Sequence, residues 1–423
     1  MNISDAERIA SVLESLKYQK TADMADADLV AVTMCSIRQS AVDRVHGLVQ
    51  KFNEIKKKNP KLKTILTGCV LKKDKKIFIE GFDHVIDIRD IKKIPELLGA
   101  KQIIFRSFQS EAMSAKKNNL LSAPDSYLDI TPKYSSDFSA NVPIMTGCNN
   151  FCSYCVVPYT REREISRTAK EIVSEIKNLV KKGYKEVWLL GQNVNSYKDA
   201  GTNFPKLLGL INDIQGEFWI RFTSSHPKDF SDELINAMAN NKKVTPYLNL
   251  PVQSGDNKVL KSMNRHYTVA EYKNKLKKLR KKIPNIAIST DIIVGFAGET
   301  KKEFMNTAKL FRDVKYDMAY INKYSPRAGT MAAKLKDNVS KEEKKNREKI
   351  LTDILKQTAL AHNKKLVGKE TLVLFNENRG NNYFGKDQYY KTVKVASDKN
   401  LLGRLIKVRI TETQPFILKG EIV

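Results

Sequence analysis

The feature that most constrains the fold is a regular alternation of short apolar segments and helical segments from about residue 142 to residue 324. The apolar segments are predicted as strands at Val142–Met145, Glu186–Leu190, Trp219–Ser224, Tyr247–Val252, Ile286–Phe296 and Met318–Tyr324. Helices are predicted between them, at Ala169–Lys182, Asp232–Asn240, Val269–Lys282 and Lys302–Val314. Six successive strand–helix units predict an open, partial (βα)6 barrel with parallel strands.

A cluster of three cysteines follows the first of these strands. Cys148, Cys152 and Cys155 have C-x3-C-x2-C spacing. Three thiolates can hold three irons of a [4Fe–4S] cluster and leave the fourth iron open to a substrate or cofactor. Ferredoxin clusters use four cysteines at other spacings, and structural zinc uses four closed ligands. The alternatives are chance clustering or a zinc knuckle with a distant fourth ligand.

Polar residues stand directly after the later predicted strands. They are Gln192-Asn193, Ser225-His226, Gln253-Ser254 and Gly298-Glu299. Because the site of a βα barrel lies at the carboxyl ends of its strands, these are candidate pocket residues. His226 is equally well explained as a hydrogen-bonded structural histidine.

The first hundred residues predict a separate doubly wound α/β domain. Strands are predicted at Asp28–Met34, Lys63–Thr67 and Val85–Ile88, and helices at Ala41–Ile55 and from a Ser4–Glu7 capping box to Leu16. Cys35 and Cys69 each follow a strand, so a parallel sheet places them at one edge as possible ligands. The alternative is two ordinary buried cysteines. The domain opens on a helix, which predicts that its first strand is missing.

The C-terminal region changes to short strands, predicted at Thr371–Phe375, Tyr390–Val395, Arg404–Ile410 and Gly420–Val423. They predict a small all-β barrel after a long charged helix at Lys341–Lys365. Small barrels of this kind often bind oligonucleotides, and an inert accessory domain is the alternative. Residues 105–140 are polar and turn-rich, as in a linker. The predicted domains are 1–104, 134–364 and 367–423.

Composition narrows the class of protein further. The 423 residues carry a formal net charge of +27, which favours a polyanionic partner such as nucleic acid, although lysine on solvated helix faces explains it equally. An odd total of 5 cysteines argues against a disulfide framework and for a reducing cytoplasm. Neither a secretory signal nor an apolar run of membrane-spanning length is visible, so we expect no membrane association.

Together these motifs resemble the radical-SAM methylthiotransferases along essentially the whole chain. The matching segments are Thr33–Arg38, Thr67–Cys69, Gly147–Arg167, Leu190–Tyr197, Ser225–Lys228, Pro251–Gly255, Ser289–Thr300 and Ser325–Arg327. The form Cys35-Ser36-Ile37-Arg38 points to the branch that acts on N6-dimethylallyladenosine next to the tRNA anticodon. The C-terminal barrel resembles the RNA-binding TRAM domain of these enzymes. Glu162 departs from the family, which usually has glycine there.

The resemblance implies a first [4Fe–4S] cluster on Cys148, Cys152 and Cys155. S-adenosylmethionine would chelate the open iron and be cleaved to a 5′-deoxyadenosyl radical, which attacks an unactivated aromatic C–H bond. Tyr154 would pack near the adenine of this cofactor. Gln192, Asn193 and Gln253 are further candidates for the cofactor pocket.

The resemblance also implies a second, sulfur-supplying [4Fe–4S] cluster with Cys35 and Cys69 among three cysteine ligands. The family's first ligand lies in a Gly-Cys-Gln-Met-Asn segment, and Met1-Asn2 match its last two residues. One hypothesis is that the natural protein begins upstream. The other is a defective second cluster, and therefore a tRNA-binding protein that cannot complete the reaction.

The implied partners are tRNA and an electron-donating flavoprotein or ferredoxin, and we expect a monomer. Alternative substrates within the family are threonylcarbamoyladenosine in tRNA and a ribosomal-protein aspartate.

Overall fold

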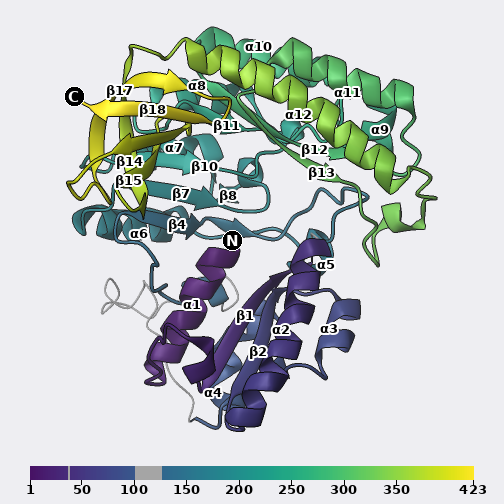
Figure 1. Ribbon diagram of the computed structural model, residues 1–423, viewed down its shortest axis with the longest axis vertical. Coiled ribbons are helices and arrows are strands. Elements are labelled where there is room, and N and C mark those ends of the chain that lie inside the picture. Colours follow the sequence, from purple (N-terminus) through teal and green to yellow (C-terminus); the bar gives the residue numbers. More distant parts are fainter. Residues whose placement is uncertain (37–38, 101–125) are drawn as a thin grey trace.

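The computed structural model describes residues 1–36, 39–100 and 126–423, and it confirms the expected α/β architecture with a small C-terminal barrel (Figure 1). The N-terminal domain lies at the bottom of the view. The strands and helices of the central barrel lie above it, and the C-terminal β-barrel, in yellow, packs against one side of the central barrel. Among the described residues, no helix is long and apolar enough to cross a membrane.

The N-terminal domain is a parallel sheet with one hydrophobic core on each face. Its strands are β1 (Leu29–Cys35), β2 (Lys63–Cys69) and β3 (His84–Val85), in the order β1-β2-β3. Its helices are α1 (Asn2–Ser15), α2 (Gln39–Lys58), α3 (Lys72–Phe78) and α4 (Ile94–Leu97). Ile65 packs with α1, whereas its neighbour Leu66 packs in the cluster of α2 and α3, because successive strand residues face opposite sides. A cavity of about 760 Å³ lies between α1 and the start of β1.

Three predictions about this region are wrong. Ser4 and Glu7 form no capping box, because α1 already begins at Asn2 and their side chains have other partners. The third strand is shorter than predicted, since a 3-10 helix begins at Ile88. The predicted linker lies partly in residues 101–125, outside the described residues, and its following part is core, because Tyr127 and Leu128 are buried against α1.

The central barrel has six parallel strands, as predicted, and these strands form two hydrogen-bonded groups. The groups are β10-β7-β4 and β11-β12-β13, and a bridge from Ile220 to Val244 joins them. The strands are β4 (Ser139–Pro143), β7 (Glu186–Leu190), β10 (Trp219–Phe222), β11 (Tyr247–Asn249), β12 (Ala287–Val294) and β13 (Met318–Lys323). The short strands are β5 (Met145–Thr146), β6 (Ile165–Ser166), β8 (Lys198–Asp199) and β9 (Thr202–Asn203).

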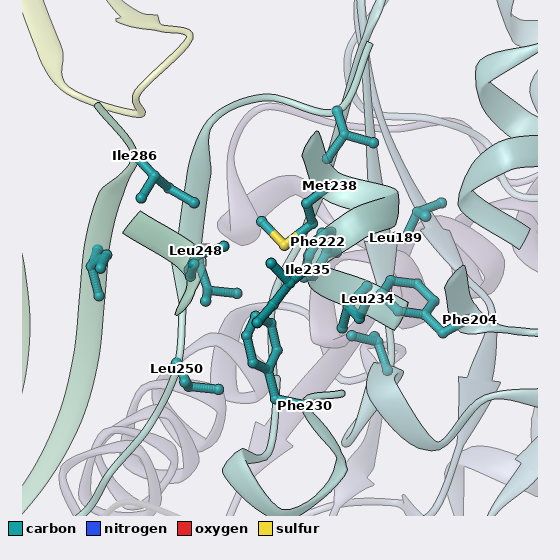
Figure 2. Packing of buried hydrophobic residues seen from close by; sticks show 14 of the residues in the cluster. Leu189, Phe204, Phe222, Phe230, Leu234, Ile235, Met238, Leu248, Leu250 and Ile286 are labelled. Carbon is teal, nitrogen blue, oxygen red and sulfur yellow. The ribbon is translucent and has the colours of Figure 1, made fainter. Parts of the chain in front are cut away.

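Most helices of the central region cover the outside of the barrel strands, whereas the short α5 lies next to the N-terminal domain. The helices of this region are α5 (Val157–Thr160), α6 (Ala169–Lys181), α7 (Phe204–Asn212), α8 (Asp232–Asn240), α9 (Asn257–Ser262), α10 (Val269–Lys282), α11 (Lys301–Val314) and α12 (Lys341–Lys364). Capping boxes begin α6, α10 and α11, where Thr168, Thr268 and Thr300 each pair with a glutamate three residues on. The core between strands and helices is apolar and mixes aliphatic with aromatic side chains (Figure 2). In it, Phe204 of α7 meets Phe222 of β10 edge-on, with ring centroids 5.1 Å apart.

The C-terminal domain is a closed barrel in the order β14-β15-β16-β18-β17. Its strands are β14 (Glu370–Arg379), β15 (Asn382–Asp387), β16 (Thr392–Ala396), β17 (Leu405–Thr413) and β18 (Ile417–Ile422). The sequence did not predict β15, which contains Gly385. A Cβ atom on Gly385 would lie 2.5 Å from the Leu374 carbonyl oxygen, so glycine permits the close approach of β14 and β15.

The C-terminal barrel docks where the central strands begin. Arg221 of β10, fully buried, donates to Glu186 Oε1 (2.6 Å) and to the carbonyl oxygens of Asp387 (2.7 Å) and Gln388 (3.2 Å). Its guanidinium lies 5.3 Å from the ring centroid of Tyr390, which also meets the ring of Trp188. Glu186 is the first residue of β7. The two barrels are therefore joined at the amino-terminal ends of the central strands.

Candidate functional site

The three-cysteine loop connects β5 to α5 and is fixed by its backbone. The Cys148 amide donates to the Glu162 carbonyl (3.0 Å), and the Ser153 amide donates to the Met263 carbonyl (3.0 Å). The Ser153 carbonyl in turn accepts from the Ala332 amide (2.8 Å). Because these bonds use only main-chain groups, the loop is held in place while its thiols stay available.

Gly147 shows why this loop has the sequence it has. Its φ is +81°, and a Cβ atom there would lie 2.0 Å from the Arg163 carbonyl oxygen. Only glycine tolerates both conditions. Glu162, where the family usually has glycine, also has a left-handed φ of +60°. Its side chain forms an ion pair with Arg89 of the N-terminal domain, so this departure gives the loop a further link to the neighbouring domain.

None of the three thiols forms a disulfide, and they lie close enough together for the charge of one to raise the pKa of another. Burial, with the neighbouring Cys152 as a second cause, raises the pKa of Cys155 to about 12, and burial also raises the pKa of Cys148. Asn150 Nδ2 lies 3.6 Å from Cys148 Sγ, and Arg265 Nη1 lies 3.4 Å from Cys152 Sγ. Three thiols, two of them with a hydrogen-bond donor at the sulfur, suit an iron–sulfur cluster, whose properties depend on such bonds.

No three described His, Cys, Asp or Glu side chains converge around the position of a single metal ion. In a [4Fe–4S] cluster each cysteine binds a different iron, so the cysteine sulfurs lie farther apart than the ligands of a single metal ion.

Cys35 and Cys69 are neighbours, as the strand pattern predicts. They are direct partners in the register of β1 and β2, at the last residue of each strand. The Ser36 amide donates to the Cys69 carbonyl (2.9 Å). Burial raises the pKa of the Cys69 thiol, and this effect outweighs the positive charge of Arg161, which lowers the pKa. Ile37 and Arg38, which contributed to the predicted substrate branch, lie outside the described residues.

Arg161 connects the two cysteine sites, which the sequence did not predict. It follows α5, directly after the three-cysteine loop, and its Nε donates to Cys69 Sγ (2.9 Å). It also forms an ion pair with Asp5 of α1, and the two side chains are 1% and 0% exposed. Its Nη1 donates to the hydroxyl of Tyr127 (3.0 Å). The only sequence signal was the position of Arg161 in the matching segment Gly147–Arg167.

Of the four predicted cofactor-pocket residues, three follow barrel strands and one lies in the three-cysteine loop. Tyr154 lies in the three-cysteine loop, with its ring centroid 6.5 Å from that of Phe296. Gln192 and Asn193 follow β7, and each has a buried side-chain oxygen without a hydrogen-bond partner. Gln253 follows β11 with a φ of +68°. That these residues contact a cofactor stays a prediction. The two buried oxygens without a partner favour it, because a bound molecule could supply the missing hydrogen bonds.

Two other candidates have hydrogen-bond partners within the protein, although Nε2 of His226 is buried without one. His226 is buried, and its Nδ1 accepts from the Lys228 amide (3.2 Å). Burial, and then the charge of Arg265, lowers the pKa of His226 to about 2, so the ring is neutral. Glu299 is buried in an ion pair with Arg347 (2.7 Å) and also accepts from the Gly295 amide (2.6 Å).

Three family models match separate parts of the chain. Residues 142–311 match the Radical SAM superfamily, residues 364–423 match the TRAM domain, and residues 1–88 match Uncharacterized protein family UPF0004. The solved structure of a radical S-adenosylmethionine methyltransferase from Kitasatospora setae is similar to this chain, with a TM-score of 0.50 and 12% sequence identity. The match covers 78% of this chain and 73% of the methyltransferase chain. The barrel and its cysteine loop therefore define a radical SAM protein.

Curated relatives identify the family within this class. A tRNA-2-methylthio-N(6)-dimethylallyladenosine synthase of Thermoanaerobacter sp. (strain X514) is 41% identical, covering 100% of this chain and 90% of the relative. Enzymes of the same name from Clostridium novyi (strain NT) and Carboxydothermus hydrogenoformans are each 39% identical, over 94% and 97% of their own lengths. The chain belongs to the family of tRNA-2-methylthio-N(6)-dimethylallyladenosine synthases.

Proposed function

We propose that this chain methylthiolates N6-dimethylallyladenosine next to the anticodon of tRNA by radical S-adenosylmethionine chemistry. Relatives of this name match the whole chain at about 40% identity. The observation that carries the proposal is the link through Arg161. It joins the three-cysteine loop to the Cys35 and Cys69 pair, and methylthiolation needs a radical source and a sulfur source side by side.

Cys148, Cys152 and Cys155 would hold one [4Fe–4S] cluster, with S-adenosylmethionine beside it. When bound, this pair supplies a carbon-centred radical that can break an aromatic C–H bond. The anchored backbone of the loop keeps the three sulfurs in position, and Arg265 donates to Cys152. Tyr154, Gln192, Asn193 and Gln253 would line the pocket of the cofactor.

Cys35 and Cys69 would belong to the second cluster, which supplies sulfur. The described residues place two thiols at this edge of the sheet, and Arg161 contacts one of them. A buried cation there favours the negative charge that thiolate-bound iron–sulfur groups carry. The number of clusters and their ligands are parts of this proposal.

The remaining assignments follow from the same function. The substrate is tRNA, and the excess of positive charge suits its phosphates. We assign residues 1–104 to the methylthiotransferase domain, 134–364 to the radical SAM core and 367–423 to the TRAM domain. A flavoprotein or ferredoxin would donate electrons to a monomeric cytoplasmic enzyme.

Anaerobic reconstitution with iron and sulfide tests the cluster assignment. Two [4Fe–4S] clusters predict about 8 iron atoms per chain, and one cluster predicts about 4. We expect the variant Cys35→Ala/Cys69→Ala to lose the second group of irons and Cys148→Ala to lose the first. Equal iron in the wild type and both variants would contradict the assignment.

Nucleoside analysis of tRNA from a strain lacking the gene tests the substrate. We expect N6-dimethylallyladenosine to accumulate without its 2-methylthio derivative, while threonylcarbamoyladenosine derivatives stay unchanged. Prenylated adenosine that stays fully methylthiolated would contradict the proposed function. Loss of a methylthiolated threonylcarbamoyladenosine would favour the alternative tRNA substrate.

A further inference from the structure

An exposed aromatic residue stands directly after the three-cysteine loop, in α5. Tyr159 of α5 is 50% exposed, and its ring meets that of Phe151 edge-on at a centroid distance of 6.5 Å. The guanidinium of Arg163 lies 4.4 Å from the centroid of the Phe151 ring. We call Phe151, Tyr159 and Arg163 the aromatic platform.

The platform belongs to the same rigid segment as the cysteines. Phe151 stands between Cys148 and Cys152 with a φ of +48°, and its carbonyl accepts from Asn264 Nδ2 (2.9 Å). The Tyr159 amide donates to the Val156 carbonyl (3.0 Å). Because the main chains of both residues are hydrogen-bonded, a partner that binds the rings has only their side chains to order.

A half-exposed tyrosine and an arginine that both contact one phenylalanine ring match the chemistry of single-stranded RNA recognition. Unpaired bases stack on aromatic rings and on guanidinium planes, and the cation also attracts phosphate. Sequence-specific recognition of RNA mostly uses loops whose bases are splayed out, as an anticodon loop offers.

We propose that the aromatic platform stacks one unpaired base of the substrate RNA, beside the adenosine that enters the three-cysteine site. This inference rests on the proposed function. Tyr159 supplies the exposed ring, Phe151 supports it, and Arg163 neutralises the adjacent phosphate. The platform thereby helps to choose which nucleotide of the loop reaches the cysteines.

The test measures binding of a fluorescent anticodon stem–loop RNA that contains N6-dimethylallyladenosine, using anaerobically reconstituted full-length protein. Stacking on one aromatic side chain is worth about 1–3 kcal/mol, which is about 5- to 150-fold in Kd. We expect Tyr159→Ala to weaken binding in this range and Tyr159→Phe to bind like the wild type. Arg163→Gln should reduce the salt dependence of log K by about one unit of slope.

Leu210→Ala is the matched control, because Leu210 is 45% exposed on α7. It should bind RNA like the wild type, and iron content and the affinity for S-adenosylmethionine should be unchanged in every variant. Unchanged RNA binding by Tyr159→Ala, or equal loss in Leu210→Ala, would overturn the inference. So would slower reduction by the electron donor with normal RNA binding, since the platform would then serve a protein partner. A wild type that binds no RNA at all would instead contradict the proposed function.

Discussion

Removing the charge of Asp5 should destabilise the junction between the N-terminal domain and the three-cysteine loop. The variant Asp5→Asn keeps the shape of the side chain but leaves the guanidinium of Arg161 without its buried carboxylate partner. Breaking a buried pair by neutralising one partner costs about 3–5 kcal/mol. With about 2–4 °C per kcal/mol for domains of 150–250 residues, the thermal midpoint should fall by about 6 °C or more.

The matched control is an exposed ion pair on the barrel. Lys273 and Asp313 lie 2.8 Å apart with side chains 45% and 35% exposed. Such pairs contribute about 0–1 kcal/mol, so Lys273→Met should shift the midpoint by at most about 4 °C. The double variant Asp5→Asn/Arg161→Met should be more stable than the sum of its single variants predicts, because it leaves no unpaired charge.

Calorimetry of the metal-free protein measures the midpoints, and the rate of thiol labelling reports local opening around Cys69. This thiol is 3% exposed, so in the wild type it should react slowly. In Asp5→Asn we expect faster labelling of Cys69 than in Lys273→Met. The reasoning is refuted if Asp5→Asn and Lys273→Met have the same midpoint and the same labelling rate.

Three further predictions concern the loop, the buried histidine and the C-terminal junction. Gly147→Ala should lose about 4 iron atoms per chain on reconstitution, whereas Gly209→Ala, where a Cβ atom meets nothing within 4 Å, should keep them; equal iron in both would contradict the role of Gly147. Because the pKa of His226 is about 2 when folded, only the unfolded chain takes up its proton below about pH 6.5, so stability should fall by about 2 kcal/mol from pH 6.5 to pH 5. His226→Asn should lack this part of the decline in urea titrations, and an identical pH dependence would disprove it. Arg221→Met leaves Glu186 as an uncompensated buried carboxylate and should cost about 3–5 kcal/mol; limited proteolysis should then release the C-terminal barrel, and wild-type resistance would contradict this.

Elements with strong periodicity could be predicted from the sequence. The limits of Glu186–Leu190, Asp232–Asn240 and Val269–Lys282 agree with the structure, because their apolar spacing and caps point to the same element. The pairing of Cys35 with Cys69 could be predicted because parallel strands end at one edge of a sheet.

Contacts between distant residues could not be predicted in this way. Arg161 meets Asp5 across 156 positions of the chain, and nothing in the local pattern of either residue indicates the pair. Ser4 and Glu7 have the spacing of a capping box, yet Glu7 accepts from the hydroxyl of Ser135 (2.7 Å), and Ser4 lies within α1. Distant residues therefore bind a side chain that the local spacing had predicted as part of a cap.

The placement of the C-terminal barrel has a consequence for how an RNA is selected. It joins the central barrel where the strands begin, whereas the cysteine loop follows the strand ends. The strand β7 has 5 residues and is about 17 Å long, and Tyr390 of the C-terminal barrel contacts Trp188 in its middle. If the C-terminal barrel binds the stem and the three-cysteine loop selects the nucleotide, the RNA has to span the distance between them. A shortened stem should then lose affinity while the modified position stays the same.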